Sequence, residues 1–289
     1  MKGILSTCKL SLRVSIAGLA LILLPYPAQP QTNRPKSTQK AQAPKKVVPE
    51  KVSPAEEPSA PQLMSVSVVR VRPEMVREWI NLNKNEIIPA LKKAGVKERS
   101  IWQTAQFGES FEYVVITPIE SLARFDDEPP LRKALGAQGY ESYLEKARKI
   151  VTAVHTFADQ GRMDLSYLGR ISGTPKFAVV ATVQVAPGRT QDFENLIKAE
   201  VLPAVKKADA QSYFVSQTLL GGDISEYTTV TLYDSFADIG KGSPILKGMG
   251  QAGYERFLRK TSGIVVRAER SVYRYNEELS FGPEGPPSK

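Results

Sequence analysis

The sequence has almost none of the side chains that bind soft metals or form disulfides. Among 289 residues it contains one cysteine, Cys8, and one histidine, His155. Cys8 stands so near the N-terminus that the rest of the chain has no thiol, which excludes disulfide bonds, thiolate metal sites and a cysteine nucleophile there. With one histidine, a zinc site would consist almost wholly of carboxylates, an unusual ligand set for that metal. We therefore predict no metal site.

Long hydrophobic runs are also missing. The apolar segment Val14–Leu24 has only eleven residues, whereas a helix needs about 20 to cross a bilayer. Because basic residues precede this segment and Ala28 follows it, residues 1–28 are predicted to be a secretory signal peptide. We expect an exported protein, periplasmic or extracellular, with no transmembrane span in its mature form. An uncleaved N-terminal anchor is the alternative, since Tyr26 fits a cleavage site poorly.

Residues 29–62 contain no aromatic residue and are rich in proline, lysine, glutamine and alanine. Such a composition buries too little apolar surface to fold, so we predict a disordered linker. Residues 1–62 also hold nine Lys and Arg against three Glu, and they account for most of the net charge of +9. The remainder is only weakly basic, and we expect no nucleic-acid partner.

The rest of the chain repeats itself. Residues 69–167 align with residues 183–281 at a constant shift of 114 positions, without a gap. Glu112-Tyr113 thus matches Glu226-Tyr227, and we expect pairs kept in both copies to serve packing. A unit of this length is a domain rather than a solenoid repeat. We predict repeat 1 at residues 63–169, repeat 2 at 176–282 and a flexible tail at 283–289.

Both copies show one order of elements. The Val-rich segments 65–72 and 177–185 predict strands. A helical period follows in each copy, with Pro89 or Pro203 inside it, where proline should kink or divide the helix. A hairpin, a second helix weakened by glycines and a last strand complete the copy. The order β-α-β-β-α-β predicts an α+β fold of two tandem ferredoxin-like repeats packed sheet to sheet, closing into a barrel around an interior space.

The segment IIPALKKAG, with its internal proline, and the hairpin and turn glycines after it resemble NIPSNAP-type and EthD-type domains of the dimeric α+β barrel superfamily. The resemblance covers residues 63–168 and 177–282 as a fused pseudo-dimer. That superfamily includes haem-degrading and cofactor-free monooxygenases and haem peroxidase-like enzymes, so the resemblance implies the fold and admits such activities. Copy two departs at Asp209, where a turn glycine is expected, and neither copy carries a catalytic signature of the family.

Four residues are candidates for chemistry. His155 is a candidate haem ligand or general base, and the position 114 residues further along is Glu269. On its strand His155 would share a face with Phe157 and point between the sheets. Arg267 and Glu269 would pair or hold an anionic ligand if they point inward, and Trp102 would line the same space. An ordinary exposed or hydrogen-bonded role is the simpler interpretation of each.

From these residues we expect a non-enzymatic exported protein that uses no cofactor. It would bind a small or apolar ligand, or a protein partner in the cell envelope, between or on its sheets. The alternative is a haem-handling or cofactor-free monooxygenase-like enzyme with its site in the cavity between the sheets.

Overall fold

The computed structural model describes residues 62–169 and 175–282. We call these two ranges the first half and the second half. The predicted signal peptide, all of the predicted linker except Gln62, most of the connection between the repeats and the predicted tail lie outside the described residues. Within the two halves, no helix combines the length and the apolar character that a membrane span requires.

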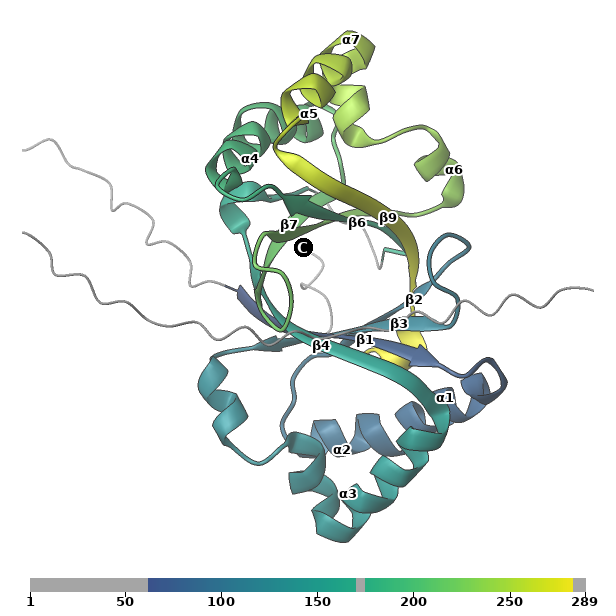
Figure 1. Ribbon diagram of the computed structural model, residues 1–289. Coiled ribbons are helices and arrows are strands. Elements are labelled where there is room, and N and C mark those ends of the chain that lie inside the picture. The colour runs from purple at the N-terminus through teal and green to yellow at the C-terminus, as the bar shows by residue number, and fades with distance from the viewer. Residues whose placement is uncertain (1–61, 170–174, 283–289) are drawn as a thin grey trace, which may run out of the picture. The chain divides into compact units, whose positions relative to one another are not determined.

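Eight strands close into an antiparallel barrel (Figure 1). Their order around the ring is β4-β1-β3-β2-β9-β6-β8-β7, and pairing of β7 with β4 closes it. A short strand, β5, adds to β7 beside the ring. The predicted α+β class and the barrel are therefore confirmed. The strands are β1 Gln62–Val71, β2 Ser100–Thr104, β3 Glu112–Ile119, β4 Val151–Gly161, β5 Tyr167–Leu168, β6 Phe177–Val185, β7 Ser212–Leu220, β8 Glu226–Tyr233 and β9 Val265–Tyr275.

Helices cover the outside of the barrel on two opposite sides, α1 to α3 on one and α4, α5 and α7 on the other (Figure 1). The α-helices are α1 Val76–Leu82, α2 Ile88–Lys93, α3 Pro130–Ile150, α4 Thr190–Leu196, α5 Leu202–Lys207, α6 Phe236–Gly240 and α7 Pro244–Thr261. Both α3 and α7 are interrupted, at Gly136 and Gly250, where φ is +70°. A left-handed φ costs glycine little, so the helix that the sequence predicts to be weakened by glycines is interrupted at one of them in each half.

Alternation along each strand decides which side chains face the helices and which face the barrel interior. On β1, Val69 and Val71 pack with Trp79 and Leu82 under the first helical layer. Val66 and the other even-numbered residues of β1 point the opposite way, into the barrel. The second helical layer has a matching core, which includes Val185, Phe193, Val201, Val215 and Tyr227.

Each predicted helix proline follows a π-helical turn. Asn83–Ile87 precedes Pro89, and Ile197–Val201 precedes Pro203. Since proline has no amide hydrogen and crowds the preceding turn, the helix widens there instead of continuing in α geometry. The turn after the helix also agrees in the two halves: Gly95 has φ +83° and Asp209 has φ +49°. Asp209 therefore adopts the left-handed conformation that the sequence pattern assigns to glycine.

Arg162 links the end of β4 to the second helical layer. Its guanidinium donates to both oxygens of Asp164, at 2.9 and 3.0 Å, and also bonds Glu194. The Tyr227 hydroxyl donates to the same Glu194 carboxylate, at 2.7 Å. Hydrogen bonding to Arg162 lowers the pKa of Asp164 to about 2 and lowers that of Glu194.

Replacing Arg162 with methionine should therefore cost about 3 kcal/mol of unfolding free energy, because it leaves a largely buried Glu194 carboxylate without its cation. Both carboxylates have depressed pKa values in the folded state, so their contribution is complete above the unfolded value near 4 and is lost as the pH falls toward 2. Urea denaturation at pH 7 and pH 3 measures this. Arg189→Met, which removes an exposed pair with Asp192, is the control and should cost less than about 1 kcal/mol.

Candidate functional site

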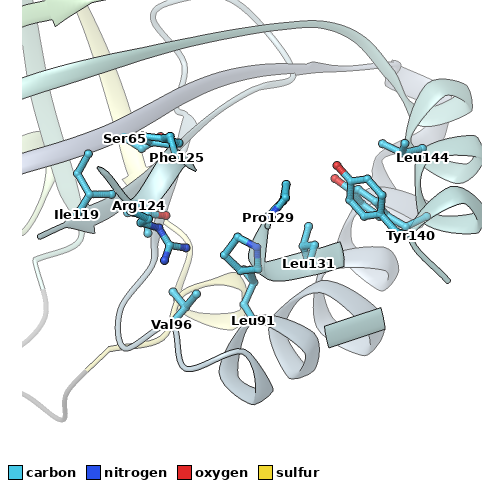
Figure 2. A pocket seen from close by; sticks show the side chains of 13 residues that line it. Ser65, Leu91, Val96, Ile119, Arg124, Phe125, Pro129, Leu131, Tyr140 and Leu144 are labelled. Atoms are coloured by element: carbon cyan, nitrogen blue, oxygen red, sulfur yellow. The ribbon is translucent and has the colours of Figure 1, made fainter. Parts of the chain in front are cut away.

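A cavity of about 510 Å³ lies between the outer sheet face and the helices of the first half. Its walls are mostly apolar, and the polar residues at or beside them are Trp79, Asn83, Arg99 and Tyr143, together with Ser67, Arg148 and Thr152. A second cavity of about 280 Å³ shares Leu91, Leu131, Tyr143 and Leu144 with the first and continues toward Arg124 and Phe125 (Figure 2). We call the two cavities together the first-half cleft.

Arg99 is a buried cation without a carboxylate partner among the described residues. Only 6% of its surface is exposed. Its Nη2 donates to Asn83 Oδ1 at 3.0 Å, while its Nη1 has no hydrogen-bond partner. Burial lowers the pKa of Arg99 to about 10, which still leaves the guanidinium charged at neutral pH. A buried charge of this kind is costly unless an anion compensates it.

Trp79 supplies a second unpaired donor in the same cleft. Its indole Nε1 is buried and has no hydrogen-bond partner in the described structure. Asn83 connects it to the guanidinium, since Asn83 Nδ2 donates to the Trp79 carbonyl at 2.8 Å while Asn83 Oδ1 accepts from Arg99. Asn83 begins the π-helical turn before Pro89, so the widened turn holds this amide beneath the sheet. Two N–H donors, one of them cationic, therefore lack an acceptor.

Tyr143 adds a hydroxyl on α3. Burial raises its pKa, the nearby charge of Arg99 lowers it in part, and Tyr140 raises it. The phenol is therefore protonated at neutral pH and can donate a hydrogen bond. Together, Arg99, Trp79 and Tyr143 can hold an anionic or strongly polarised oxygen at the end of an apolar molecule.

The second half has no such set of polar groups at the matching positions. The residues 114 positions further along are Phe193 for Trp79, Ile197 for Asn83, Tyr213 for Arg99 and Phe257 for Tyr143. All four belong to or pack against the hydrophobic core of the second half. The cation, the amide and the indole are thus peculiar to the first half.

Helix spacing gives a reason for the difference. Gly248 of α7 lies against α5 so closely that a Cβ there would be 2.0 Å from the Ala204 carbonyl oxygen. The positions 114 residues earlier than Gly248 and Ala204 are Ala134 in α3 and Ala90 in α2. Because alanine has the Cβ that this contact forbids, α3 cannot approach α2 as α7 approaches α5. The first helical layer therefore retains space that the second layer closes.

The four residues singled out from the sequence lie on the other face of the sheet. Trp102 and His155 face the barrel interior in one row, connected by the pairings Trp102–Val114, Val114–Val68 and Val68–His155. The Trp102 ring packs edge-on against Tyr275, with the ring centroids 5.1 Å apart. His155 is exposed, and its ring lies 5.7 Å from that of Phe157.

Arg267 and Glu269 also lie on the interior face, on β9. The structure brings these two together: Arg267 Nε donates to Glu269 Oε1 at 2.9 Å, and both side chains are mostly exposed. They therefore form an ion pair at the barrel mouth. None of the four predicted residues lines the first-half cleft.

The residues of the first-half cleft do not fit a haem held by histidine. The only histidine of the chain, His155, points into the barrel, on the opposite face of the sheet from the cleft. The lining residues of the cleft include no cysteine or methionine either. Among the described residues no group of three or more His, Cys, Asp or Glu side chains is placed to hold a metal ion.

Comparison of the two copies could have found the cleft residues. The sequence places Arg99 against Tyr213 and Asn83 against Ile197, which are changes from polar to apolar at positions of the same structural role. The sequence prediction rests on one such difference, between His155 and Glu269 on the last strand, and takes no account of those at Asn83 and Arg99. What the sequence could not show is that Arg99 is buried.

Known structures share the fold at very low sequence identity. A proposed monooxygenase from Fusobacterium nucleatum is 11% identical, with a TM-score of 0.55 over 80% of this chain and 99% of that one. A mutant chlorite dismutase from Candidatus Nitrospira defluvii is 8% identical, with a TM-score of 0.50 over 75% and 93%. A NIPSNAP family protein of unknown function from Agrobacterium tumefaciens is 16% identical over 34% and 86%, and its TM-score of 0.29 is too low to carry an argument. No protein-family model and no curated protein matches the chain. The comparisons therefore support the α+β barrel fold, and they do not establish an activity.

Proposed function

We propose that the first-half cleft binds a small, largely apolar molecule that ends in an acidic oxygen, such as an aromatic carboxylate, a phenol or an enol. The observation that carries this proposal is the pair of buried, unpartnered donors, Arg99 Nη1 and Trp79 Nε1, in a cleft with apolar walls. An anionic oxygen would compensate the Arg99 charge, and the apolar body would fill the space against Leu91 and Leu131. A hydrogen bond to a charged group contributes about 1.5–3 kcal/mol, which is enough to select the anion over a neutral analogue.

Calorimetric titration with three probes of similar shape tests this proposal. 2-Naphthoate should bind saturably, 2-naphthol more weakly, and 2-acetylnaphthalene, a neutral ketone without an acidic oxygen, at least about tenfold more weakly than the carboxylate. Equal affinity for the three probes would mean that the cleft selects only apolar surface. An absence of saturable naphthoate binding would contradict the proposal directly.

A second candidate function is oxidation of such a ligand by O2 without a cofactor. Donors that stabilise an anionic oxygen lower the pKa of a bound phenol or enol, and the anion is the form that O2 oxidises most readily. With 2-naphthol, the ring C–H and the O–H are lost, one oxygen atom enters a new carbonyl and the other leaves as water. The shared fold with a proposed monooxygenase is compatible with this chemistry. Oxygen uptake that requires both 2-naphthol and Arg99 would support it, and no uptake would leave the cleft a binding site only.

We also propose that the barrel is a fused pseudo-dimer of two ferredoxin-like repeats. In both halves the first strand lies between the third and fourth strands of the repeat, and the pairing Arg70–Glu112 recurs as Gln184–Glu226 at the shift of 114. A register shift also occurs at Arg70/Val71 and again at Gln184/Val185. In this interpretation the second half keeps the core of a partner subunit while the first half keeps the site.

Export of the protein is a further proposal, supported by the composition of residues 1–28 alone. N-terminal sequencing of the protein recovered from producing cells tests it. A mature chain that begins near residue 29 supports an exported protein, an intact N-terminus in the membrane fraction supports the uncleaved anchor, and an intact N-terminus in the soluble fraction contradicts both.

A further inference from the structure

The barrel interior contains a carboxylate whose environment is incomplete. Asp159 on β4 is only 3% exposed, and its side chain faces inward in the row of Met64 and Thr218. Ser216 donates to Asp159 Oδ2 at 2.7 Å, whereas Oδ1 has no hydrogen-bond partner. Burial raises the pKa of Asp159, and hydrogen bonding from the Ser216 and Thr218 hydroxyls lowers it in part. A buried, unpaired acceptor is costly and calls for a donor.

The opposite side of the barrel shows how a complete version of this arrangement looks. There, Glu112 accepts a hydrogen bond from the Tyr273 hydroxyl at 2.9 Å and is paired with Arg70 Nε at 3.4 Å. The anion thus has both a cation and a hydroxyl donor. Trp102 and Tyr275 fill the space beside them.

The two halves of the barrel meet at two seams, where β2 pairs with β9 and where β7 pairs with β4. Glu112 lies beside the first seam, and at the matching position of the second seam the acid lacks both partners. Glu226 stands for Glu112, but Gln184 stands for Arg70 and Asp159 stands for Tyr273. The three residues of the first seam carry one positive and one negative charge. Their counterparts in the second seam include two carboxylates and no cation. The small residues Ser216 and Gly161 stand where Trp102 and Tyr275 fill the first seam, although Phe214 takes up part of that space.

The surrounding charges do not neutralise this pair. The pKa of Glu226 is raised, chiefly by burial, and Arg267 on β9 offsets this only in part because its guanidinium is engaged by Glu269. The negative charges of Asp159, Asp223 and Glu269 raise this pKa further. His155, the remaining titratable side chain on this part of the interior face, is exposed.

A cavity lies beside residues that neighbour the pair, although neither Asp159 nor Glu226 lines it. Gln184, Thr218 and Asp223 line this cavity of about 770 Å³ at this end of the second half. Its other walls include the apolar side chains Leu219, Ile224 and Val266. A ligand whose charged head lies at the pair would extend its apolar body past Thr218 into this cavity.

We propose that the seam between β7 and β4 is a second ligand site, which binds the ammonium group of a small organic amine between Asp159 and Glu226. The ammonium group supplies the two things that this seam lacks relative to the other one, a positive charge and N–H donors. A resident metal ion is a poorer fit, because no cluster of three metal-ligating side chains occurs among the described residues. This inference concerns the opposite face of the sheet from the first-half cleft and does not depend on the function proposed for that cleft.

The experiment is an NMR titration of the full chain with n-butylammonium, followed at the backbone amides of Ser216 and Thr218. Tetramethylammonium has the charge without N–H donors, and 1-butanol has a donor without the charge. We expect saturable binding of n-butylammonium and at least about tenfold weaker binding of both analogues. Equal binding of tetramethylammonium would contradict a site made of unfilled hydrogen-bond acceptors.

Three variants complete the test. Asp159→Asn and Glu226→Gln should each weaken n-butylammonium binding at least about tenfold, whereas Tyr273→Phe, in the other seam, should leave it unchanged. All three should keep the far-UV circular dichroism spectrum of the wild type and unfold cooperatively in urea, which shows that they are folded without reference to the cleft. No saturable binding of n-butylammonium, or full binding to both carboxyl variants, would overturn the proposal.

Discussion

Replacing Arg99 by methionine should weaken the binding of 2-naphthoate by roughly 10- to 100-fold. The variant removes a hydrogen bond between a buried cation and the ligand anion, which contributes about 1.5–3 kcal/mol. Arg99→Lys keeps the charge on a differently shaped group, and its affinity for 2-naphthoate should lie between those of the wild type and Arg99→Met. Lysine cannot donate to Asn83 and to the ligand with the same fork of N–H groups. Calorimetric titration at pH 7 gives the three affinities.

The matched control lies in the second half. Tyr213 occupies the position 114 residues after Arg99 and is buried in the hydrophobic core of the second half. Tyr213→Phe should leave naphthoate binding unchanged. If both variants weakened binding equally, the effect of Arg99 would be a general loss of packing and the assignment of the site would be wrong.

The stability of the same variants distinguishes a binding residue from a structural one. In the ligand-free protein, loss of the unpaired cation is favourable, while loss of the donor to Asn83 Oδ1 is unfavourable, so Arg99→Met should change the unfolding free energy by less than about 1 kcal/mol. The double variant Arg99→Met, Asn83→Leu removes both polar groups and should be more stable than the wild type by about 1–3 kcal/mol. A large loss of stability in the double variant would show that the polar pair supports the fold.

Gly248→Ala should destabilise the protein by about 3 kcal/mol or more. The added Cβ would lie 2.0 Å from the carbonyl oxygen and 2.7 Å from the Cα of Ala204. Both are backbone atoms, so the contact cannot be relieved by a side-chain rotation, and α7 must move away from α5. Denaturant unfolding measures the loss.

The reverse change in the first half is the control. Ala134→Gly adds no atom, so its cost is that of glycine in a helix, about 0.5–1 kcal/mol. If Gly248→Ala cost no more than Ala134→Gly, the close contact between α5 and α7 would not be what distinguishes the two helical layers. The explanation for the open cleft of the first half would then fail.

The fold could be predicted largely because it depends on patterns that are local or repeated. Alternating Val-rich segments marked the first strands, and Pro89 and Pro203 marked an irregularity in each first helix. Their precise form, a π-helical turn, was not predicted, because the missing amide of a proline does not by itself say whether a helix bends, breaks or widens. Asp209 shows a related limit: its left-handed conformation is set by the turn and not by its residue type.

The candidate site could not be predicted, for two physical reasons. From the sequence alone, an arginine is expected to lie on the surface. Only the packing of Trp79 and Tyr143 around Arg99 makes it a buried cation. The space beside it depends on a contact between helices far apart in the chain, which Gly248 permits at Ala204 and Ala134 prevents at Ala90. Neither effect leaves a local pattern.

The central claim, that the first-half cleft is the binding site, is tested most directly by a crystal structure of the protein with 2-naphthoate. The account predicts the carboxylate within hydrogen-bond distance of Arg99 Nη1 and Trp79 Nε1, with the rings against Leu91 and Leu131. A naphthoate molecule in the barrel interior or under the second helical layer, with the Arg99 cleft unchanged, would contradict it.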